Sequence, residues 1–288
     1  MNAGMHDAIN LGWKLSLVLK GMANNDLLET YDLERRPNAE KLIQYDEDIS
    51  VLVSGRLPKS WKGDSKEDPH VALGTVLQEA KGFNTGLTLS YKENLAVLKQ
   101  QSNGANGHTE EKATTIPAPA VPGYRAPDIK LQTPAMWHDI WLHQLTPNKA
   151  KFYVVVFAGD IAQTRQHFIK LTTVARETAG LRIDGASQNG TNGTQVNGNT
   201  TKQTPLPAVY LTITKGKVAN PWFELGTDPL GKVYYDGDGS AHERYGVGNS
   251  DGGVFILRPD GWIGARFDLS SSNLADSIAQ YLAGILNV

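Results

Sequence analysis

The first residues of the chain, MNAGMHDAINLGWKL, combine small and polar residues with the beginning of a helical pattern. The first turn of a helix carries backbone N–H groups without intrahelical partners and about half a positive charge. Gly4 has no side chain, so a ligand or another backbone could approach this turn closely. The segment predicts either a site for an electron-rich group at a helix start or a surface helix with a polar start.

Arg35 and Arg36 form a second candidate, because neighbouring guanidinium groups can bind phosphate. Both lie within a long helical pattern. A place on the helix surface or a salt bridge between helices is therefore the expected alternative.

Other chemistries are excluded or disfavoured by the residue types. The chain has no cysteine, so disulfide exchange, thiolate catalysis and cysteine-based metal sites are impossible. The segment DGDGSAHE (236–243) resembles the start of a calcium loop, but an EF-hand needs Glu at the twelfth position, which is Val247. His138 and His143 have a spacing that fits no helical zinc pair. We therefore expect neither a catalytic residue nor a metal site.

Composition bounds the class of protein. The chain has 288 residues, enough for one large domain or two ordinary ones, and a net charge of −2. This balance argues against a general binder of nucleic acid or anionic membranes. Polar residues interrupt the first apolar run, which matches neither a secretory signal nor a membrane span of about twenty apolar residues. We expect a cytoplasmic protein.

The first hundred residues have a mainly helical pattern. Apolar residues at helical spacing predict a helix over 4–20 that ends at Gly21, with one buried stripe formed by Ala8, Leu11, Leu15 and Val18. A second helical pattern starts at Asp26, an expected N-cap with Glu29 at capping-box spacing, and it ends at Gly55. Pro37 either kinks this helix or starts another. We also predict a loop over 57–68, a helix over 70–80 and a strand over 86–91.

The rest of the chain alternates strands and helices. Residues 101–122 have the composition of a low-complexity linker, and residues 185–205 that of a disordered insertion. Between and after them the pattern predicts strands over 151–159 and 208–214, with a helix starting at about residue 160 between the strands. A hairpin over 252–267 and a final amphipathic helix follow. This order predicts a small α/β domain with a mixed sheet.

Four segments carry a resemblance to a known family. The run NAGMHDAINLGWKL (2–15) resembles the segment after the second flavin-contacting motif of aromatic-ring hydroxylases of the phenol hydroxylase type. YDLERRP (31–37) is similar to the next helix of that family. PGYRAPDIKL (122–131) and YGVGNSDGGVFILRPDGWIGARF (245–267) resemble its C-terminal thioredoxin-like domain.

The resemblance implies roles for particular residues. Met1 and Asn2 would contact the flavin of FAD through their main chain, and Ala3 and Gly4 would line its approach. Asp7 would hold the helix start in place through a partner that the sequence does not identify. The complete enzyme would use FAD and NAD(P)H to hydroxylate a phenolic substrate, and the thioredoxin-like domain would serve homodimer contacts.

The departures from the family pattern limit this expectation. The chain lacks the Gly-x-Gly-x-x-Gly motif that binds the FAD pyrophosphate, and it lacks the Gly-Asp motif that precedes the opening helix. We therefore expect the C-terminal portion of a monooxygenase, with a partial FAD site and no activity alone. The alternative is a stand-alone, non-catalytic dimerisation or interaction module.

The predicted domain organisation follows from the same resemblance. Residues 1–100 would be an incomplete FAD-binding domain, 101–122 the linker, and 123–288 the thioredoxin-like α/β domain. Without the missing sheet, the apolar stripe of the first helix should be partly exposed.

Overall fold

The computed structural model describes residues 2–98, 119–134, 136–177, 208–216 and 220–287. The strands of these residues form a seven-stranded mixed sheet in the order β2-β1-β5-β4-β3-β6-β7. Their bounds are β1 Lys130–Gln132, β2 Asp139–Trp141, β3 Phe152–Phe157, β4 Ala208–Lys215, β5 Lys232–Asp236, β6 Gly253–Leu257 and β7 Ile263–Phe267. The helices are α1 Asn2–Leu19, α2 Asp26–Val53, α3 Pro69–Glu79, α4 Lys81–Asn84, α5 Leu142–Leu145, α6 Ile161–Glu177, α7 Pro221–Leu225, α8 Ser240–Tyr245 and α9 Leu274–Ile285.

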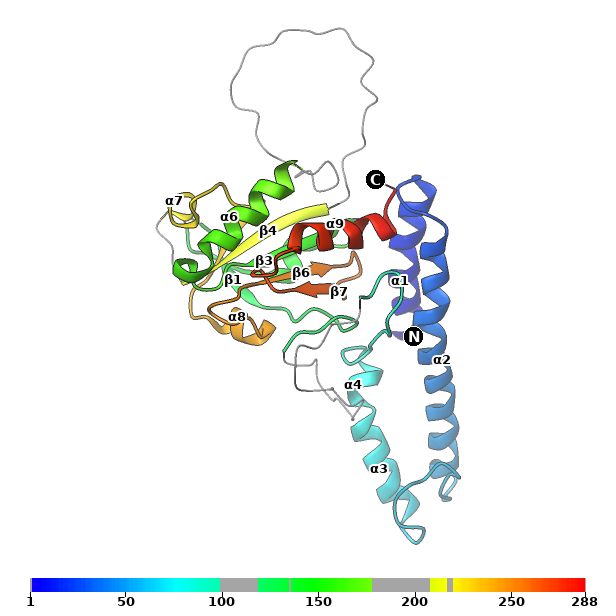
Figure 1. The fold of residues 1–288 in the computed structure, drawn as a ribbon. Helices are drawn as coiled ribbons and strands as arrows, with labels where there is room; N and C mark the ends of the chain where they lie inside the picture. The colour runs from blue at the N-terminus through cyan, green and yellow to red at the C-terminus, as the bar shows by residue number, and fades with distance from the viewer. Residues whose placement is uncertain (1, 99–118, 135, 178–207, 217–219, 288) are drawn as a thin grey trace.

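Both faces of the sheet are covered around β3. This strand pairs in parallel with β4 and antiparallel with β6, and all six of its residues are buried. Alternate residues join different apolar clusters: Phe152 packs with α6 and α9, whereas Tyr153 packs with α8 on the opposite face. Figure 1 shows α6 and α9 on one side of the sheet and α8 on the other. The predicted α/β fold with a mixed sheet is confirmed.

Helices α1 and α2 run side by side along the α/β domain (Figure 1). Trp13 and Leu17 of α1 belong to the same apolar cluster as α9 and the central strands. The Asn287 N–H donates to the Met22 carbonyl oxygen at 2.9 Å, so the last described residues lie beside the α1–α2 connection. These two helices, which we call the helical portion, therefore share one core with the α/β domain.

Most predicted elements are confirmed, and the helix starts supply one correction. Helix α1 is followed by Gly21 at φ +68°, as its pattern predicts. Pro37 lies inside a continuous α2. The predicted cap at Asp26 is wrong, because Asn25 holds the cap position without a side-chain hydrogen bond and Asp26 is the first helical residue.

The predicted strand over 86–91 is also wrong. Gly86 has φ +76°, and only Ser90 forms an isolated bridge, to Tyr124. The Tyr91 N–H donates to the Gly123 carbonyl oxygen at 2.8 Å, so loop backbone satisfies it without a ladder. The alternating pattern instead buries Leu89 and Tyr91 against Trp262. The predicted linker falls mainly, and the predicted insertion wholly, outside the described residues.

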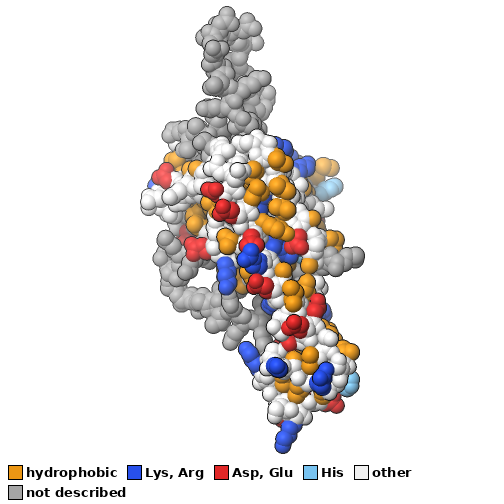
Figure 2. All heavy atoms as spheres, turned by 90° about the vertical axis from the view of Figure 1, so that its right-hand side faces the viewer, with side chains coloured by type: hydrophobic (Ala, Val, Ile, Leu, Met, Phe, Trp, Pro, Cys, Tyr) orange, Lys and Arg blue, Asp and Glu red, His pale blue; other side chains and the backbone are white. Residues whose placement is uncertain are grey.

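Helix α1 is polar on part of its buried side and apolar on its outer side. Asn10 and Lys14 are buried, and the outer side carries large exposed apolar residues: Met5 (53% exposed), Ile9 (43%), Leu15 (37%) and Leu19 (82%). The expected buried stripe is therefore wrong, since Ala8 and Leu15 are exposed. The expected exposure of apolar surface on this helix is confirmed. Figure 2 looks onto the helical side of the molecule and shows apolar side chains gathered there among charged ones. Within the described ranges, each helix is too short or too polar to cross a lipid bilayer.

We predict that the outer face of α1 binds a hydrophobic dye. The double substitution Ile9→Ser and Leu15→Ser should lower dye fluorescence and change the free energy of unfolding by only about 0.5 kcal/mol per site, because both side chains are partly exposed. The control Leu17→Ala removes a buried side chain and should cost about 2–5 kcal/mol. Unchanged dye binding in the double variant would contradict this assignment.

Candidate functional site

The start of α1 is open and lacks nearby negative charge on its own first turn. The helix begins at Asn2, and its first turn contains no acidic residue. Ala3 is half-buried and Gly4 is exposed, and a Cβ atom added at Gly4 would meet nothing within 4 Å. The side of this turn at Gly4 is therefore open, and the first N–H groups of a helix have no intrahelical partner. Met1 lies outside the described residues.

Arg35 of α2 is the partner of Asp7. The Arg35 Nε atom lies 2.6 Å from Asp7 Oδ1, and only 7% of the Arg35 side chain is exposed. This ion pair joins α2 to the second turn of α1, which fixes the helix start as the sequence suggests for Asp7. Arg36 instead pairs with Asp32 on the surface of α2 at 2.8 Å. Of the two alternatives for these arginines, the structure therefore favours salt bridges over phosphate binding.

His6 packs the same end of α1 against the loop after α4. Its ring lies edge-on to Trp262, with 6.2 Å between ring centroids. Gly86 has φ +76°, and a Cβ atom added there would clash with the His6 ring, so this position favours glycine. Burial, with Arg35 and Arg125 nearby, lowers the pKa of His6. The imidazole is therefore neutral at neutral pH and adds no positive charge to the helix start.

A buried group of charged and polar residues lies one to two turns further along α1. We call Asn10, Lys14, Glu34, Arg258 and Asp260 the central cluster. Arg258 binds Glu34 through two nitrogens at 2.5 and 2.9 Å and binds Asp260 at 2.6 Å. Glu34 also accepts hydrogen bonds from Lys14 at 2.9 Å and from Asn10 at 2.7 Å. Two cations therefore face two carboxylates in a site closed to solvent.

The central cluster controls the ionisation of its members. Burial opposes the charge on Glu34, but Arg258 and Lys14 outweigh it and lower the pKa of Glu34 to about 2. Burial lowers the pKa of Lys14 to about 8, although Glu34 acts in the opposite direction. Sequence patterns did not single out Lys14, Glu34 or Asp260. The one available signal is the pair Asn10 and Lys14, polar residues one helical turn apart beside Trp13.

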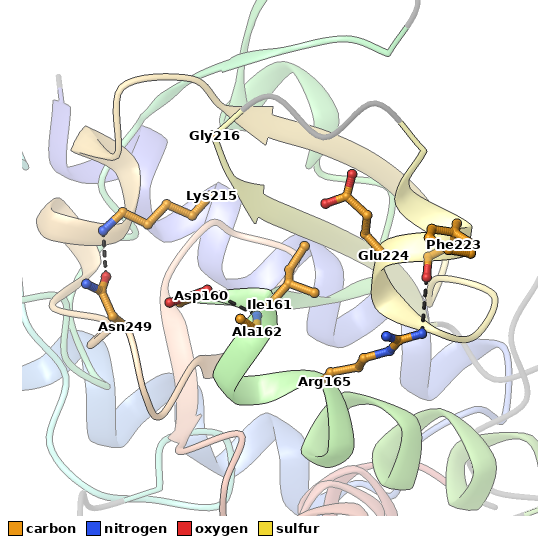
Figure 3. A pocket seen from close by; sticks show the side chains of 9 residues that line it. All are labelled: Asp160, Ile161, Ala162, Arg165, Lys215, Gly216, Phe223, Glu224 and Asn249. Carbon is orange, nitrogen blue, oxygen red and sulfur yellow. Dashed lines mark hydrogen bonds between the residues drawn. The ribbon is translucent and has the colours of Figure 1, made fainter.

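A separate pocket of about 640 Å³ lies beside the turn after β3, which falls within the segment 158–163 (Figure 3). The end of β4, helix α7 and Asn249 line the rest of it. Three of its charged side chains already have partners. The Asp160 side chain caps the Ala162 N–H at 3.1 Å, Lys215 binds Asn249 at 2.5 Å, and Arg165 donates to the Phe223 carbonyl oxygen. The pocket is thus a surface depression in which Asp160, Lys215 and Arg165 are engaged by neighbouring groups of the protein.

The segment that resembles a calcium loop has a structural role. The Asp236 carboxylate accepts hydrogen bonds from the backbone N–H groups of Ala241 and His242, at 3.2 and 2.8 Å. It also lies 2.6 Å from His242 Nδ1. The His242 Nε2 atom accepts the Gly159 N–H at 3.3 Å, which ties α8 to the turn after β3. Among the described residues, no three metal-binding side chains gather into a site.

Two family models match the chain. Residues 89–288 match the model for the phenol hydroxylase C-terminal dimerisation domain, and residues 1–46 match a model for an FAD-binding domain. The chain belongs to the phenol hydroxylase family. The resemblance to phenol hydroxylases that the opening, helical and C-terminal segments carry is therefore confirmed.

Similar proteins support the same assignment. Phenol 2-monooxygenase fsqG of Aspergillus fumigatus is 26% identical over 276 residues, which cover 93% of this chain and 42% of that protein. A 3-(3-hydroxy-phenyl)propionate/3-hydroxycinnamic acid hydroxylase of Escherichia coli is 46% identical over 68 residues, or 23% of this chain and 12% of that protein. The chain thus spans less than half the length of the fungal relative.

Solved structures share the fold. The flavin-dependent monooxygenase PieE, in complex with FAD and substrate, matches 98% of this chain and 44% of its own, with a TM-score of 0.61 and 18% identity. Aklavinone-11 hydroxylase, in a ternary complex with FAD and aklavinone, matches 100% of this chain and 40% of its own, with a TM-score of 0.58 and 18% identity.

The residues at the start of α1 would suit one edge of a flavin. The start of α1, where a Cβ added at Gly4 would meet nothing within 4 Å, would offer backbone N–H groups to an electron-rich ring edge. The sequence contains no glycine fingerprint for the pyrophosphate. These residues would therefore hold only part of the cofactor.

We predict that Glu34→Gln destabilises the protein in a pH-dependent way. At pH 7 the substitution leaves Arg258 and Lys14 short of one buried anion and should cost about 3–5 kcal/mol of unfolding free energy. The folded-state pKa of Glu34 lies below its ordinary value of 4.5, so its stabilising contribution is complete above pH 4.5. That contribution is lost as the pH falls towards 2.

Denaturant unfolding of both proteins between pH 7 and pH 3 checks this expectation. The difference between wild type and Glu34→Gln should be constant above pH 4.5 and should shrink below it. A difference that grows on acidification would contradict the assignment of Glu34 as the buried anion.

Proposed function

We propose that this chain functions as the C-terminal portion of an FAD- and NAD(P)H-dependent monooxygenase that hydroxylates phenolic compounds. The main observation in support is the open, glycine-bearing start of α1, which the Asp7–Arg35 ion pair holds at 2.6 Å. The similarity to a phenol 2-monooxygenase over less than half of that protein supports the same assignment. Alone, the chain is expected to be inactive.

The proposed role of α1 is electrostatic. Main-chain groups of Met1 and Asn2 would contact the flavin, and Ala3 and Gly4 would line its approach. When bound, the cofactor supplies the redox chemistry of the hydroxylation. The N–H groups of the first turn would stabilise negative charge at the flavin edge, and the neutral His6 beside them leaves this polarity to the backbone.

The proposed role of the α/β domain is self-association. The match of residues 89–288 to a dimerisation domain supports a homodimer as the working assembly. We also propose the division into residues 1–100, a linker at 101–122, and the domain at 123–288.

The transcript provides the first test of this function. We expect the reading frame before codon 1 to encode a strand followed by Gly-x-Gly-x-x-Gly and, later, a Gly-Asp pair. The protein that includes this segment should purify with flavin absorbance and should consume NADPH when phenol is added. Residues 1–288 expressed alone are the matched control and should do neither.

Two results would contradict the proposal. One is an in-frame stop codon directly before codon 1, which would favour the stand-alone interaction module. The other is a longer protein that carries the glycine motif but neither retains flavin nor oxidises NADPH with any phenol offered.

A further inference from the structure

Helix α1 is positioned largely by polar contacts. Trp13 and Leu17 join the apolar core, but Asn10 and Lys14 both direct their side chains to the carboxylate of Glu34. Trp13 adds a hydrogen bond from its Nε1 atom to Asp260 at 3.0 Å. The large apolar residues of the outer face contribute little, because they are exposed. The placement of α1 therefore depends on what holds Glu34 and Asp260.

Both carboxylates are held by Arg258, which lies in the turn between β6 and β7. Asp260 binds Nε of Arg258 at 3.1 Å and Nη2 at 2.6 Å, so the turn itself orients the guanidinium. The turn closes through the Gly261 N–H, which donates to the Arg258 carbonyl oxygen at 2.9 Å. The guanidinium also lies over the rings of Trp13 and Tyr91, at 5.4 and 5.2 Å from their centroids.

Adjacent residues of α2 carry this contact to the start of α1. Glu34 binds Arg258 of the α/β domain, and the next residue, Arg35, binds Asp7 near the start of α1. One turn of α2 therefore connects the β6–β7 turn with the helix start through two neighbouring side chains.

We propose that Arg258 is a positioning residue for the start of α1, and that the β6–β7 turn of the α/β domain thereby sets the geometry of the flavin edge. The flavin part of this role rests on the proposed function. Without the guanidinium, Glu34 and Asp260 would have Lys14 as the remaining cation of the central cluster. Because an uncompensated buried charge is costly, α1 in a variant that lacks this guanidinium should open locally before the sheet unfolds.

Hydrogen–deuterium exchange on residues 1–288 tests this role without any flavin. In Arg258→Met, amides of residues 6–19 should exchange at least tenfold faster than in the wild type. Amides of β3 should keep the wild-type rate. Arg258→Lys restores a cation but cannot bridge two carboxylates in the same way. The amide exchange rate of α1 in Arg258→Lys should fall between the rates in the wild type and in Arg258→Met.

Tyr245→Phe is the matched control. It removes a buried hydrogen bond to the Pro127 carbonyl oxygen on the opposite face of the sheet. This substitution should not selectively accelerate amide exchange in α1.

The proposal is overturned if α1 and β3 lose protection equally in Arg258→Met, or if α1 keeps the wild-type rate. Should Arg258→Met not fold, the same comparison in Arg258→Lys decides. An exchange result of either kind is independent of whether the longer protein binds FAD, so the two proposals can fail separately.

Discussion

The structure depends on a buried set of charges that balances to zero. Lys14 and Arg258 face Glu34 and Asp260, and all four are at least nine-tenths buried. Such ions are tolerated inside a protein only when each has close partners, because transfer from water is costly. The two parallel contacts between Arg258 and Glu34 provide this geometry. The helical portion and the α/β domain must therefore stay together for the cluster to remain compensated.

This constraint explains the unusual distribution of side chains on α1. The helix turns Asn10 and Lys14 inwards, towards Glu34, and leaves Ile9 and Leu19 outside. In an ordinary surface helix the apolar stripe faces the core. Here the polar contacts help to fix the rotation of the helix, and large apolar side chains remain exposed on its outer side. The fungal relative fsqG is more than twice as long as the region that matches this chain.

Elements that depend on local pattern could be predicted from the sequence. The run of β-branched and aromatic residues at β3 and the amphipathic pattern of α9 were sufficient for their assignment. Residues 86–91 alternate apolar and polar side chains as a strand would, but their partners are a loop and Trp262, so no strand forms. Local pattern does not reveal which backbone will lie alongside a segment.

The candidate site was predictable only in part. The motif resemblance located the start of α1 and suggested that Asp7 has an anchoring role, but its partner Arg35 is 28 residues away. The contact between Glu34 and Arg258 joins residues 224 positions apart. Charged residues are usually exposed, so no pattern indicated that Lys14 and Arg258 would be buried. Such pairs follow from the tertiary fold.

A double-mutant cycle between Glu34 and Arg258 measures most directly whether this buried ion pair joins α1 and α2 to the α/β domain. The free energy of unfolding would be compared for wild type, Glu34→Gln, Arg258→Met and the double variant. If Arg258 and Glu34 hold each other in the core, the double variant should lose less than the sum of the single losses, with a coupling energy of at least about 2 kcal/mol. Additive losses, within about 0.5 kcal/mol, would show that the two residues do not join the helical portion to the α/β domain.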